Sequence, residues 1–599
     1  MSQTAVTAPF AATVAHVVAP PGTAVAEGDV LVYLEIMKME QPVTAPVGGV
    51  VAAVDVVVGD GVAAGQRLAL IGPAEAPAAD RPAAPAGDGA TGVRTDLAEV
   101  RRRRGLLADD ARPEAVASRH DRGMRTAREN VADLLDEGSF SEYGGLGIAA
   151  QRGRRGLDEL LARTPADGLI TGTGTVNADL VGPARARVAV AAYDYTVLAG
   201  TQGLTNHHKK DRLFRLAHTH RLPVVVFAEG GGGRPGDTDG AGASWLDAEA
   251  FELFARLSGR VPTVAIVNGR CFAGNAALAG SADVIIATEG STLGMAGPAM
   301  IEGGGLGVVD PDDIGPMDVQ VANGVVDVLV RDEAAAVAAA QQYLSYTQGP
   351  VAAPEPHDQT ALRDAVPENR KRTYDVRRIV EVLADPGSVL ELRPGFAPGV
   401  VTAFARIGGQ PVGVVANDPR HLGGAIDADG ADAVSRHLEL CDAYGLAVVV
   451  LCDTPGFMVG PEAERDGGVR RFSRMFVAGA RLGVPIIAVV TRKAYGLGAQ
   501  AMLGGHLKVP ALTVGWPTAE LGPMGLEGAV RLGFRRELES IEDPDERAAR
   551  EQALIDAAHA GARGLNVATY AEIDDVIDPA DTRERILQTL AAVTPPTTA

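Results

Sequence analysis

Residues 222–229 (LPVVVFAE) are echoed by residues 446–453 (LAVVVLCD), 224 positions later. A second pair of segments, residues 261–267 and 484–490, repeats at an offset of 223. All four are short apolar runs that alternate with amphipathic stretches, which is the pattern of buried strands in an α/β fold. Two matches at nearly one offset predict two copies of one α/β domain.

Each copy carries a glycine-containing turn directly after a predicted buried strand and before a predicted helix. The turn is residues 271–276 (CFAGNA) in the first copy and residues 494–499 (AYGLGA) in the second. Backbone N–H groups at a helix N-terminus have no partner within the helix and can stabilise an anion, and Gly lets a ligand approach closely. A single turn of this kind usually only redirects the chain, but its duplication predicts a pair of oxyanion holes.

A separate repeat lies at the N-terminus, where residues 7–34 align without a gap on residues 44–71 at an offset of 37. Both halves alternate apolar with polar or small residues and are punctuated by Gly, which predicts short strands joined by tight turns. Two such halves make a small β-sandwich with approximate two-fold symmetry. The segment 35–41 (EIMKMEQ) connects the halves, so we expect Lys38 at an exposed hairpin tip, although an isolated surface lysine usually has no function.

After Gly72 the composition shifts abruptly to Ala, Pro and acidic residues. Roughly 20 residues of semi-extended Pro-rich chain can span on the order of 60 Å, enough for a carrier to visit two sites, although an inert spacer has the same composition. The predicted organisation is a small β domain at 1–72, an Ala/Pro linker at 73–92, and two α/β domains at 93–350 and 351–599.

The composition excludes several classes of protein. A formal net charge of −21 argues against a general nucleic-acid binder, which needs a basic field. The sequence contains no unbroken stretch of about 20 apolar residues, so no membrane span is predicted. The three cysteines, Cys271, Cys441 and Cys452, form no CxxC pair, so neither a disulfide framework nor a metal site is expected and a reducing cytoplasm fits best.

The triplet Met37-Lys38-Met39 within a duplicated β-sandwich resembles biotin carboxyl carrier domains. Lipoyl domains share this architecture, but their lysine typically has Asp before it and Ala after it. From about residue 93 to the C-terminus the chain resembles the carboxyltransferase subunits of biotin-dependent acyl-CoA carboxylases. The segments that carry this second resemblance are 119–130 (RHDRGMRTAREN), 134–140 (LLDEGSF), 194–197 (DYTV), 453–457 (DTPGF) and 492–496 (RKAYG). A carrier directly before a carboxyltransferase resembles the C-terminal half of single-chain long-chain acyl-CoA carboxylases.

The resemblance implies a flattened biotinyl β-sandwich followed by two tandem crotonase-like (ClpP/crotonase) domains. It also implies covalent biotin on Lys38, flanked by Met37 and Met39, and transfer of CO2 from carboxybiotin to the α-carbon of an acyl-CoA. In this family the first hole would hold the thioester enolate and the second the biotin ureido oxygen. Their donors would be the N–H groups of Gly274 and Asn275, and those of Leu497 and Gly498.

The resemblance also suggests which residues contact the substrate. Gly232, Gly233 and Arg234 correspond to a turn near the ligand in the family, and Gln500 stands where propionyl-CoA-type members have an Asp that influences acyl length. Among the cations, Lys209 and Lys210 belong to the best local cluster for the negative CoA moiety, although a solvated helix face would look the same in sequence.

Several partners follow from the same resemblance: a separate ATP-dependent biotin carboxylase, a biotin protein ligase, and copies of this chain in a hexamer built as a trimer of dimers. A cytoplasmic role in fatty acid metabolism would fit. Two alternatives remain open at this point. The chain could belong to a biotin-dependent decarboxylase or transcarboxylase, or it could be a carrier and scaffold whose crotonase pair is inactive, which the two retained glycine turns disfavour.

Overall fold

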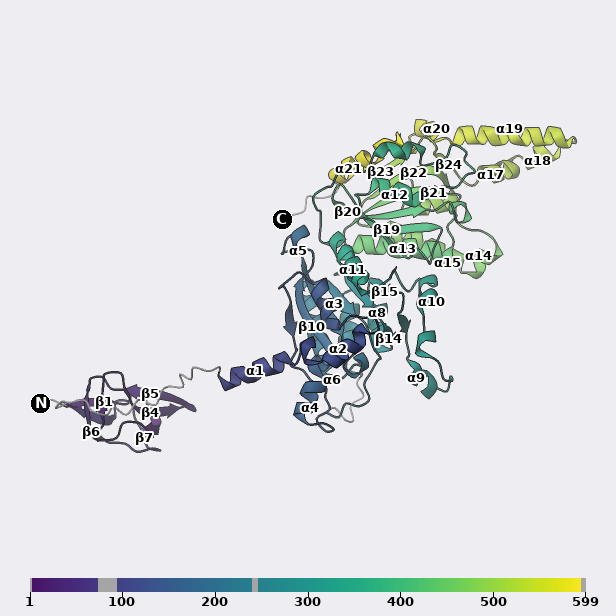
Figure 1. The fold of residues 1–599 in the computed structure, drawn as a ribbon. Helices are drawn as coiled ribbons and strands as arrows, with labels where there is room; N and C mark the ends of the chain where they lie inside the picture. The colour runs from purple at the N-terminus through teal and green to yellow at the C-terminus, as the bar shows by residue number, and fades with distance from the viewer. Residues whose placement is uncertain (1–2, 74–93, 240–245, 594–599) are drawn as a thin grey trace. The chain divides into compact units, whose positions relative to one another are not determined.

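The computed structural model describes residues 3–73, 94–239 and 246–593 (Figure 1). The chain divides between Val100 and Arg101 into two compact units. The predicted linker at 73–92 lies almost entirely outside the described residues.

The N-terminal unit consists of two four-stranded sheets, ordered β1-β8-β6-β3 and β5-β4-β2-β7. The strands are β1 (Thr4–Thr7), β2 (Ala12–Val17), β3 (Ala24–Val25), β4 (Val30–Ile36), β5 (Met39–Thr44), β6 (Gly49–Val54), β7 (Gly61–Val62) and β8 (Arg67–Gly72). At the offset of 37, β2 corresponds to β6, β3 to β7 and β4 to β8, so each sheet is the counterpart of the other. Side chains from both sheets point into one shared core that includes Leu31, Leu34 and Leu68. The predicted two-fold β-sandwich is confirmed.

The second unit contains two large sheets, both antiparallel at the start and parallel afterwards. The first has the order β17-β15-β13-β12-β11-β10-β9, and the second has the order β18-β19-β20-β21-β22-β23-β25 with β24 paired to β22. Strands of the first sheet are β9 (Ser141–Tyr143), β10 (Leu169–Thr175), β11 (Arg187–Tyr193), β12 (Val224–Phe227), β13 (Thr263–Val267), β15 (Val284–Thr288) and β17 (Val328–Val330). Strands of the second are β18 (Leu390–Leu392), β19 (Val400–Ile407), β20 (Gln410–Asn417), β21 (Ala447–Thr454), β22 (Ile486–Tyr495), β23 (Leu512–Gly515), β24 (Glu520–Gly522) and β25 (Asp575–Val576). Two further short strands, β14 (Arg270–Phe272) and β16 (Thr292–Gly294), form a separate parallel pair.

The two sheets repeat one arrangement of strands and helices. At the offset of 224, α6 (Leu204–His220) corresponds to α13 (Ala428–Ala443), and α8 (Gly274–Gly280) corresponds to α16 (Gly496–Met502). An equivalent hydrogen bond closes the C-terminus of both long helices. Leu222 N–H donates to Ala217 O after α6, and Leu446 N–H donates to Cys441 O after α13. The predicted duplication of an α/β fold is therefore confirmed.

Helix α11 (Glu333–Thr347) packs against strands of both sheets. Its Tyr343 and Tyr346 are buried, and the Tyr346 ring stacks on Phe404 of β19 at a centroid distance of 5.7 Å. Because α11 is apolar on most of its surface, it can be shared by the cores of both halves. The two copies thus form one continuous unit.

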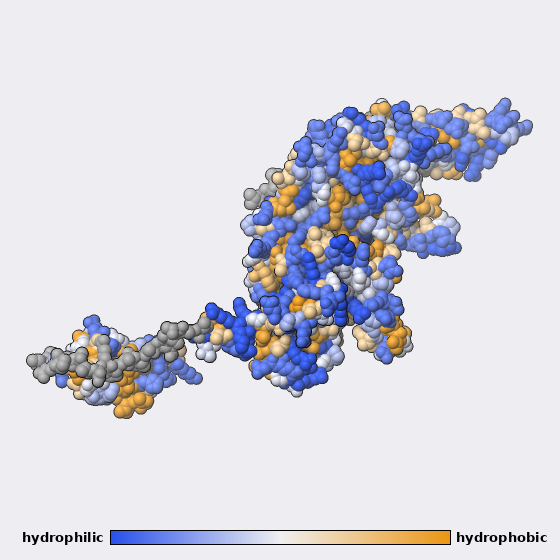
Figure 2. Space-filling view, in the orientation of Figure 1, coloured by the Kyte–Doolittle hydropathy of each residue, from blue (hydrophilic) through white to orange (hydrophobic). Residues whose placement is uncertain are grey.

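The remaining helices cover the sheets or project from them. They are α1 (Thr95–Gly105), α2 (Pro113–His120), α3 (Ala127–Leu134), α4 (Leu157–Arg163), α5 (Ala178–Val181), α7 (Ala250–Ala255), α9 (Pro298–Gly303), α10 (Met317–Ala322), α12 (Val376–Leu383), α14 (Pro461–Arg465), α15 (Gly468–Arg481), α17 (Leu526–Gly533), α18 (Arg535–Glu539), α19 (Pro544–Ala562), α20 (Gly564–Thr569) and α21 (Thr582–Val593). Figure 1 shows α19 extending away from the second sheet, and Figure 2 shows that its surface is mostly hydrophilic. Within the described residues, no helix combines the length and the apolar character that a membrane crossing requires.

Candidate active site

The carrier lysine predicted from sequence lies at the tip of the β4–β5 hairpin. Ile36 pairs with Met39 across the hairpin, so the turn consists of Met37 and Lys38 alone. Their φ angles are 51° and 64°, the positive values that a two-residue type I′ turn requires at both positions. Non-glycine residues adopt such angles uncommonly, so the pairing of β4 and β5 must hold the turn in shape. The Lys38 side chain is exposed at a rigid tip.

The methionines beside Lys38 are open to solvent. Met37 is 93% exposed and Met39 is 65% exposed, and the adjoining Ile36 is also exposed, whereas Leu34, farther along β4, lies in the core. Nothing in the folding of this domain requires two large apolar side chains there, so the methionines form a surface that another protein can recognise. A presented amine on a firm hairpin between two exposed apolar side chains fits the attachment of biotin.

The first glycine turn leads from β14 into α8. Ala273 precedes the helix with φ 51° and ψ −120°, a conformation that strains any residue with a Cβ and that clusters at functional sites. Among the described residues, the backbone N–H groups of Gly274 and Asn275 have no acceptor, as expected for the first turn of a helix. A Cβ at Gly232 would lie 2.5 Å from the Ala273 Cβ and 3.2 Å from the Gly274 nitrogen. Only glycine at 232 leaves room beside these N–H groups.

The Asn275 side chain holds this turn from behind. Its Nδ2 donates to the carbonyl oxygens of Gly200 (3.1 Å) and Glu229 (2.8 Å), and its Oδ1 accepts from Gln202 Nε2 at 2.6 Å. These bonds tie the start of α8 to the end of β12 and to the short 3-10 helix Leu198–Gly200. The orientation of the two free N–H groups is thereby fixed by buried contacts.

The second turn leads from β22 into α16 and is built on the same plan. Gly496 has φ 61°. A Cβ at Gly498 would lie 2.6 Å from the carbonyl carbon of Gly456 and 2.8 Å from the Phe457 nitrogen, so a second glycine loop closes on this turn. Leu497 is 63% exposed and Gln500 is also exposed, which places both side chains on the open side of the turn.

The offset of 224 pairs Gly274 with Gly498 and Gly232 with Gly456. The two donor pairs expected from sequence are therefore one residue out of step, because Gly274 and Asn275 correspond to Gly498 and Ala499. Gly498 belongs both to the donor pair expected from sequence, Leu497 and Gly498, and to the pair that the offset gives, Gly498 and Ala499. Its counterpart Gly274 is equally confined, but there a Cβ would meet the Gln202 side chain at 2.9 Å and not the backbone.

Two buried carboxylates behind the turns were assigned no role from sequence. Glu229 receives two bonds from Arg119, at 2.6 and 3.0 Å. Its counterpart at the offset of 224, Asp453, contacts Arg492 at 2.9 Å and Lys493 at 3.1 Å. Burial raises the pKa of Glu229 to about 7 even though Arg119 opposes the shift. Both acids end the two segments whose similarity revealed the duplication, so the signal was present in the sequence.

The structure encloses Lys209 and Lys210, which the sequence places in a cationic cluster for the CoA moiety. Lys209 Nζ donates to the carbonyl oxygens of Ala166 (2.8 Å) and Leu169. Lys210 is 0% exposed, and its Nζ lies 3.0 Å from the Tyr193 hydroxyl. Burial lowers the pKa of Lys209 to about 8 and that of Lys210 to about 7. Neither amine faces solvent, because both lie on the side of α6 that packs on the sheet.

Arg234 is also enclosed. Its Nη1 contacts Asp167 at 2.6 Å and Asp237 at 3.3 Å, and its Nη2 donates to the Thr201 carbonyl at 2.9 Å. Two buried carboxylates already balance its charge, so Arg234 fastens the glycine loop 231–233 rather than presenting a free cation. Gly232 and Gly233 lie in that loop, with the Gly232 carbonyl accepting from Gln202 N–H at 2.8 Å.

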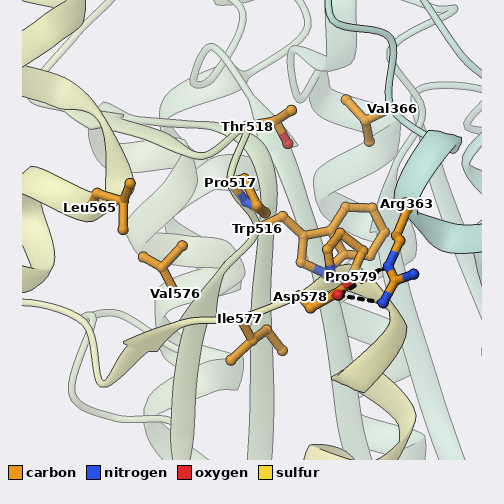
Figure 3. A pocket seen from close by; sticks show the side chains of 10 residues that line it. All are labelled: Arg363, Val366, Trp516, Pro517, Thr518, Leu565, Val576, Ile577, Asp578 and Pro579. Atoms are coloured by element: carbon orange, nitrogen blue, oxygen red, sulfur yellow. Dashed lines mark hydrogen bonds and ion pairs between the residues drawn. The ribbon is translucent and has the colours of Figure 1, made fainter. Parts of the chain in front are cut away.

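A pocket of about 500 Å³ beside β23 contains none of the predicted site residues (Figure 3). It is lined mostly by apolar side chains around Trp516, with the exposed Arg363–Asp578 ion pair at its edge (2.7 Å). A neighbouring pocket of about 380 Å³ includes Arg492 and Glu520 and approaches the second turn through Tyr495, whose hydroxyl donates to Glu520 at 2.8 Å. In the described part of the chain, no three His, Cys, Asp or Glu residues are grouped to hold a metal ion.

Comparison with known proteins agrees with this geometry. Residues 4–71 match the family model described as "Biotin-requiring enzyme", and residues 118–596 match the model described as "Carboxyl transferase domain". The chain is 35% identical over 489 residues to the methylmalonyl-CoA carboxyltransferase 12S subunit of Propionibacterium freudenreichii subsp. shermanii, covering 79% of this chain and 90% of that protein. It is 32% identical over 513 residues to the biotin-dependent long chain acyl-coenzyme A carboxylase beta4 subunit of Mycobacterium tuberculosis, covering 81% and 92%.

Comparison with solved structures gives the same result. A single-chain, multi-domain long-chain acyl-CoA carboxylase matches with a TM-score of 0.80 and 53% identity, over 98% of this chain and 56% of that one. The present chain thus spans little more than half the length of that enzyme. A transcarboxylase 12S structure matches with a TM-score of 0.73 and 30% identity, over 85% and 98%. The expected biotinyl sandwich and crotonase-like pair are confirmed, and the chain belongs to the carboxyl transferase family, with a biotin carrier domain at its N-terminus.

Proposed function

We propose that this chain carries biotin on Lys38 and transfers a carboxyl group from it to the α-carbon of an acyl-CoA, as the carrier and carboxyltransferase of an acyl-CoA carboxylase. The observation that supports this most directly is the presence, in one chain, of a presented hairpin lysine and two equivalent helix-start turns, whose first N–H groups have no acceptor within the described residues. Those features match the two steps of the reaction, which are delivery of the carboxyl group and stabilisation of two transient oxyanions.

The backbone supplies the chemistry of the protein itself. The N–H groups of Gly274 and Asn275 can donate to a thioester oxygen as it becomes an enolate, and those of Leu497 and Gly498 can donate to a second oxyanion. A well-placed donor of this kind is worth about 2.7 to 4 kcal/mol at the transition state. Biotin, when bound, supplies the carboxyl group and a nitrogen that can take the α-proton. For that reason no histidine is assigned as a base.

The acyl chain that we propose is a long one. The 53% identity to a structure described as a long-chain enzyme supports it, as does the uncharged Gln500 on the open side of the second turn. The measurement is a comparison of kcat/KM across acyl-CoA substrates of increasing length, with bicarbonate, ATP and a biotin carboxylase present. A clear preference for acetyl-CoA or propionyl-CoA would reject this part of the proposal.

We also propose the partners and setting of the reaction. A separate ATP-dependent biotin carboxylase loads the carrier, a biotin protein ligase modifies Lys38, and the chain works in the cytoplasm as a hexamer that shares active sites between copies. The relatives named above are described as subunits, which supports a separate carboxylase. A related transcarboxylase 12S structure is described as a hexamer assembly, which supports the oligomer.

Replacement of the carrier lysine tests the function. Lys38→Ala should abolish both biotin attachment and carboxyl transfer through the carrier, because the variant lacks the amine that would hold the cofactor. Binding of acyl-CoA should be unchanged. Lys371→Ala, at another exposed lysine, is the matched control and should keep both biotin and activity. Full activity of Lys38→Ala without added biotin would refute the proposal, with attachment measured by mass spectrometry and transfer measured with labelled bicarbonate.

A transcarboxylase is the second candidate, favoured by the 35% identity to a methylmalonyl-CoA carboxyltransferase subunit. That function would draw the carboxyl group from a carboxylated donor instead of bicarbonate. Activity that persists without ATP and bicarbonate, but needs a carboxylated acyl-CoA, would select it.

A further inference from the structure

A buried chain of polar side chains runs from α6 to the first oxyanion turn. Lys210 Nζ lies 3.0 Å from the Tyr193 hydroxyl, and Gln202 Nε2 donates to that same hydroxyl at 3.1 Å. Gln202 Nε2 also donates to Asn275 Oδ1 at 2.6 Å, and Asn275 Nδ2 then binds the carbonyl oxygens described above. All four side chains are at most 3% exposed. This series of hydrogen bonds ends at Asn275, whose backbone N–H is one of the two donors of the first turn.

Gln202 touches both residues that supply the N–H pair. Besides its bond to Asn275, its carboxamide packs on Gly274, where a Cβ would lie 2.9 Å from Nε2 and 3.0 Å from Oε1. Both amide hydrogens of Gln202 are used, one toward Tyr193 and one toward Asn275. A shift of the Tyr193 hydroxyl would thus be passed to the turn through a single side chain.

The second copy of the fold has no counterpart of these linked polar side chains. At the offset of 224, the counterparts of Lys210, Gln202 and Asn275 are apolar. They are, in that order, Val434, Ile426 and Ala499, and all three are buried. The counterpart of Tyr193 is Asn417, which bonds to the Asp453 N–H at 3.1 Å and to the Met502 sulfur. Valine in place of lysine supports the same helix on the same sheet, without the cost of burying an amine.

We propose that Lys210 is a positioning residue of the first oxyanion hole, acting through Tyr193 and Gln202 to hold the Gly274 and Asn275 N–H groups at the angle that an enolate oxygen requires. The inference rests on the proposed function for its chemical meaning. It also distinguishes the two holes: buried polar side chains position the first, whereas close backbone packing, with apolar residues in place of those side chains, positions the second.

The neighbours of Lys210 support a role in holding the Tyr193 hydroxyl rather than a structural ion pair. No carboxylate bonds to Nζ among the described residues; the amine lies instead 5.6 Å from the centre of the Tyr193 ring and 6.0 Å from that of Phe251. Burial lowers the pKa of Lys210 to about 7, with Asp211 and Asp167 opposing the shift. An amine held this way can bind a hydroxyl firmly without a fixed counter-charge.

The test combines enzyme kinetics with hydrogen exchange on the full-length, biotinylated chain. Lys210→Met and Tyr193→Phe should each lower kcat for carboxyl transfer by about 10- to 100-fold and change KM for acyl-CoA by less than about 3-fold, because a misplaced hole affects the transition state more than binding. The double variant should be no slower than about the worse single variant, since both act through one chain. Amide exchange should accelerate in peptides covering 271–278 and stay unchanged in peptides covering 494–502.

Tyr343→Phe is the matched control. Tyr343 is a fully buried tyrosine of α11 whose hydroxyl has no partner among the described residues, so its loss should leave kcat and both exchange patterns unchanged. Unchanged kcat and exchange in Tyr193→Phe would overturn the proposal, as would fully multiplicative effects in the double variant. If Lys210→Met fails to fold, Tyr193→Phe still decides. If the wild-type chain transfers no carboxyl group, the proposed function fails, while the exchange data still judge the polar chain.

Discussion

The two glycine turns share a backbone plan but differ in what stands behind them. A Cβ at Gly498 would meet the backbone of Gly456 and Phe457, whereas a Cβ at Gly274 would meet the side chain of Gln202. A backbone neighbour cannot move without moving its strand, but a carboxamide can rotate or shift. The second hole is thus set by main-chain packing, and the first by a side chain that other residues can adjust. A duplicated fold can therefore keep an N–H pair in each copy while the two pairs stabilise different oxyanions.

The largest difference between the copies should come from their buried carboxylates. Asp453→Asn should destabilise the chain more than Glu229→Gln, because Asp453 compensates two cations, Arg492 and Lys493, and is fully buried. Breaking a buried pair costs about 3–5 kcal/mol. The loss should be smaller for Glu229, whose charged form burial already disfavours. Urea unfolding of both variants measures this, and a larger loss for Glu229→Gln would contradict it.

The turns themselves provide the next test. Gly498→Ala should lower kcat by about 100-fold or more, because its Cβ would force the backbone at Gly456 apart and displace an N–H donor. Gly274→Ala should cost about 10-fold, since Gln202 can yield. Circular dichroism should show both variants folded. Equal losses in the two variants would mean that the difference in packing has no functional consequence.

The smallest expected effect is on the pH dependence of the free energy of unfolding. It arises from Lys210 in the first copy, because its counterpart in the second copy, Val434, does not titrate. Burial lowers the pKa of Lys210 to about 7, whereas an unfolded lysine titrates near 10.4. Between these values the folded chain binds fewer protons than the unfolded chain, so its free energy of unfolding should rise with pH, relative to Lys210→Met, by at most about 1.4 kcal/mol per unit. The nearby Tyr193, His207, Asp211 and Asp167 are present in both proteins. Unfolding at pH 7, 8 and 9 measures the difference, and a constant difference would contradict the assigned pKa direction.

Local patterns in the sequence were sufficient for the architecture. The repeats at offsets of 37 and 224 are visible residue by residue, and they predicted both the two-fold sandwich and the duplicated sheets. Placement of Lys38 at a hairpin tip followed from the symmetry of the two halves. Such features depend on neighbours close in the chain or on a fixed spacing, so they survive in the sequence.

The interior of the site was harder to predict. Arg119 and Glu229 are 110 positions apart, and no periodicity connects them. The burial of Lys210 did leave a trace: it lies three and four residues before the buried Leu213 and Phe214, on one helical face. The sequence prediction of a cationic cluster for CoA was based on its charge and not on that spacing. Which face of a charged helix turns inward is decided by a partner sheet that the local sequence does not describe.

A single-turnover experiment tests the division of labour between the two holes most directly. The carrier on Lys38 is loaded with a labelled carboxyl group, freed of biotin carboxylase, and followed with and without acyl-CoA. In Gly274→Ala, transfer to acyl-CoA should slow while loss of label in the absence of acyl-CoA stays at the wild-type rate; in Gly498→Ala, both should slow. If both variants slow the two processes equally, the holes do not hold different oxyanions and the account is wrong.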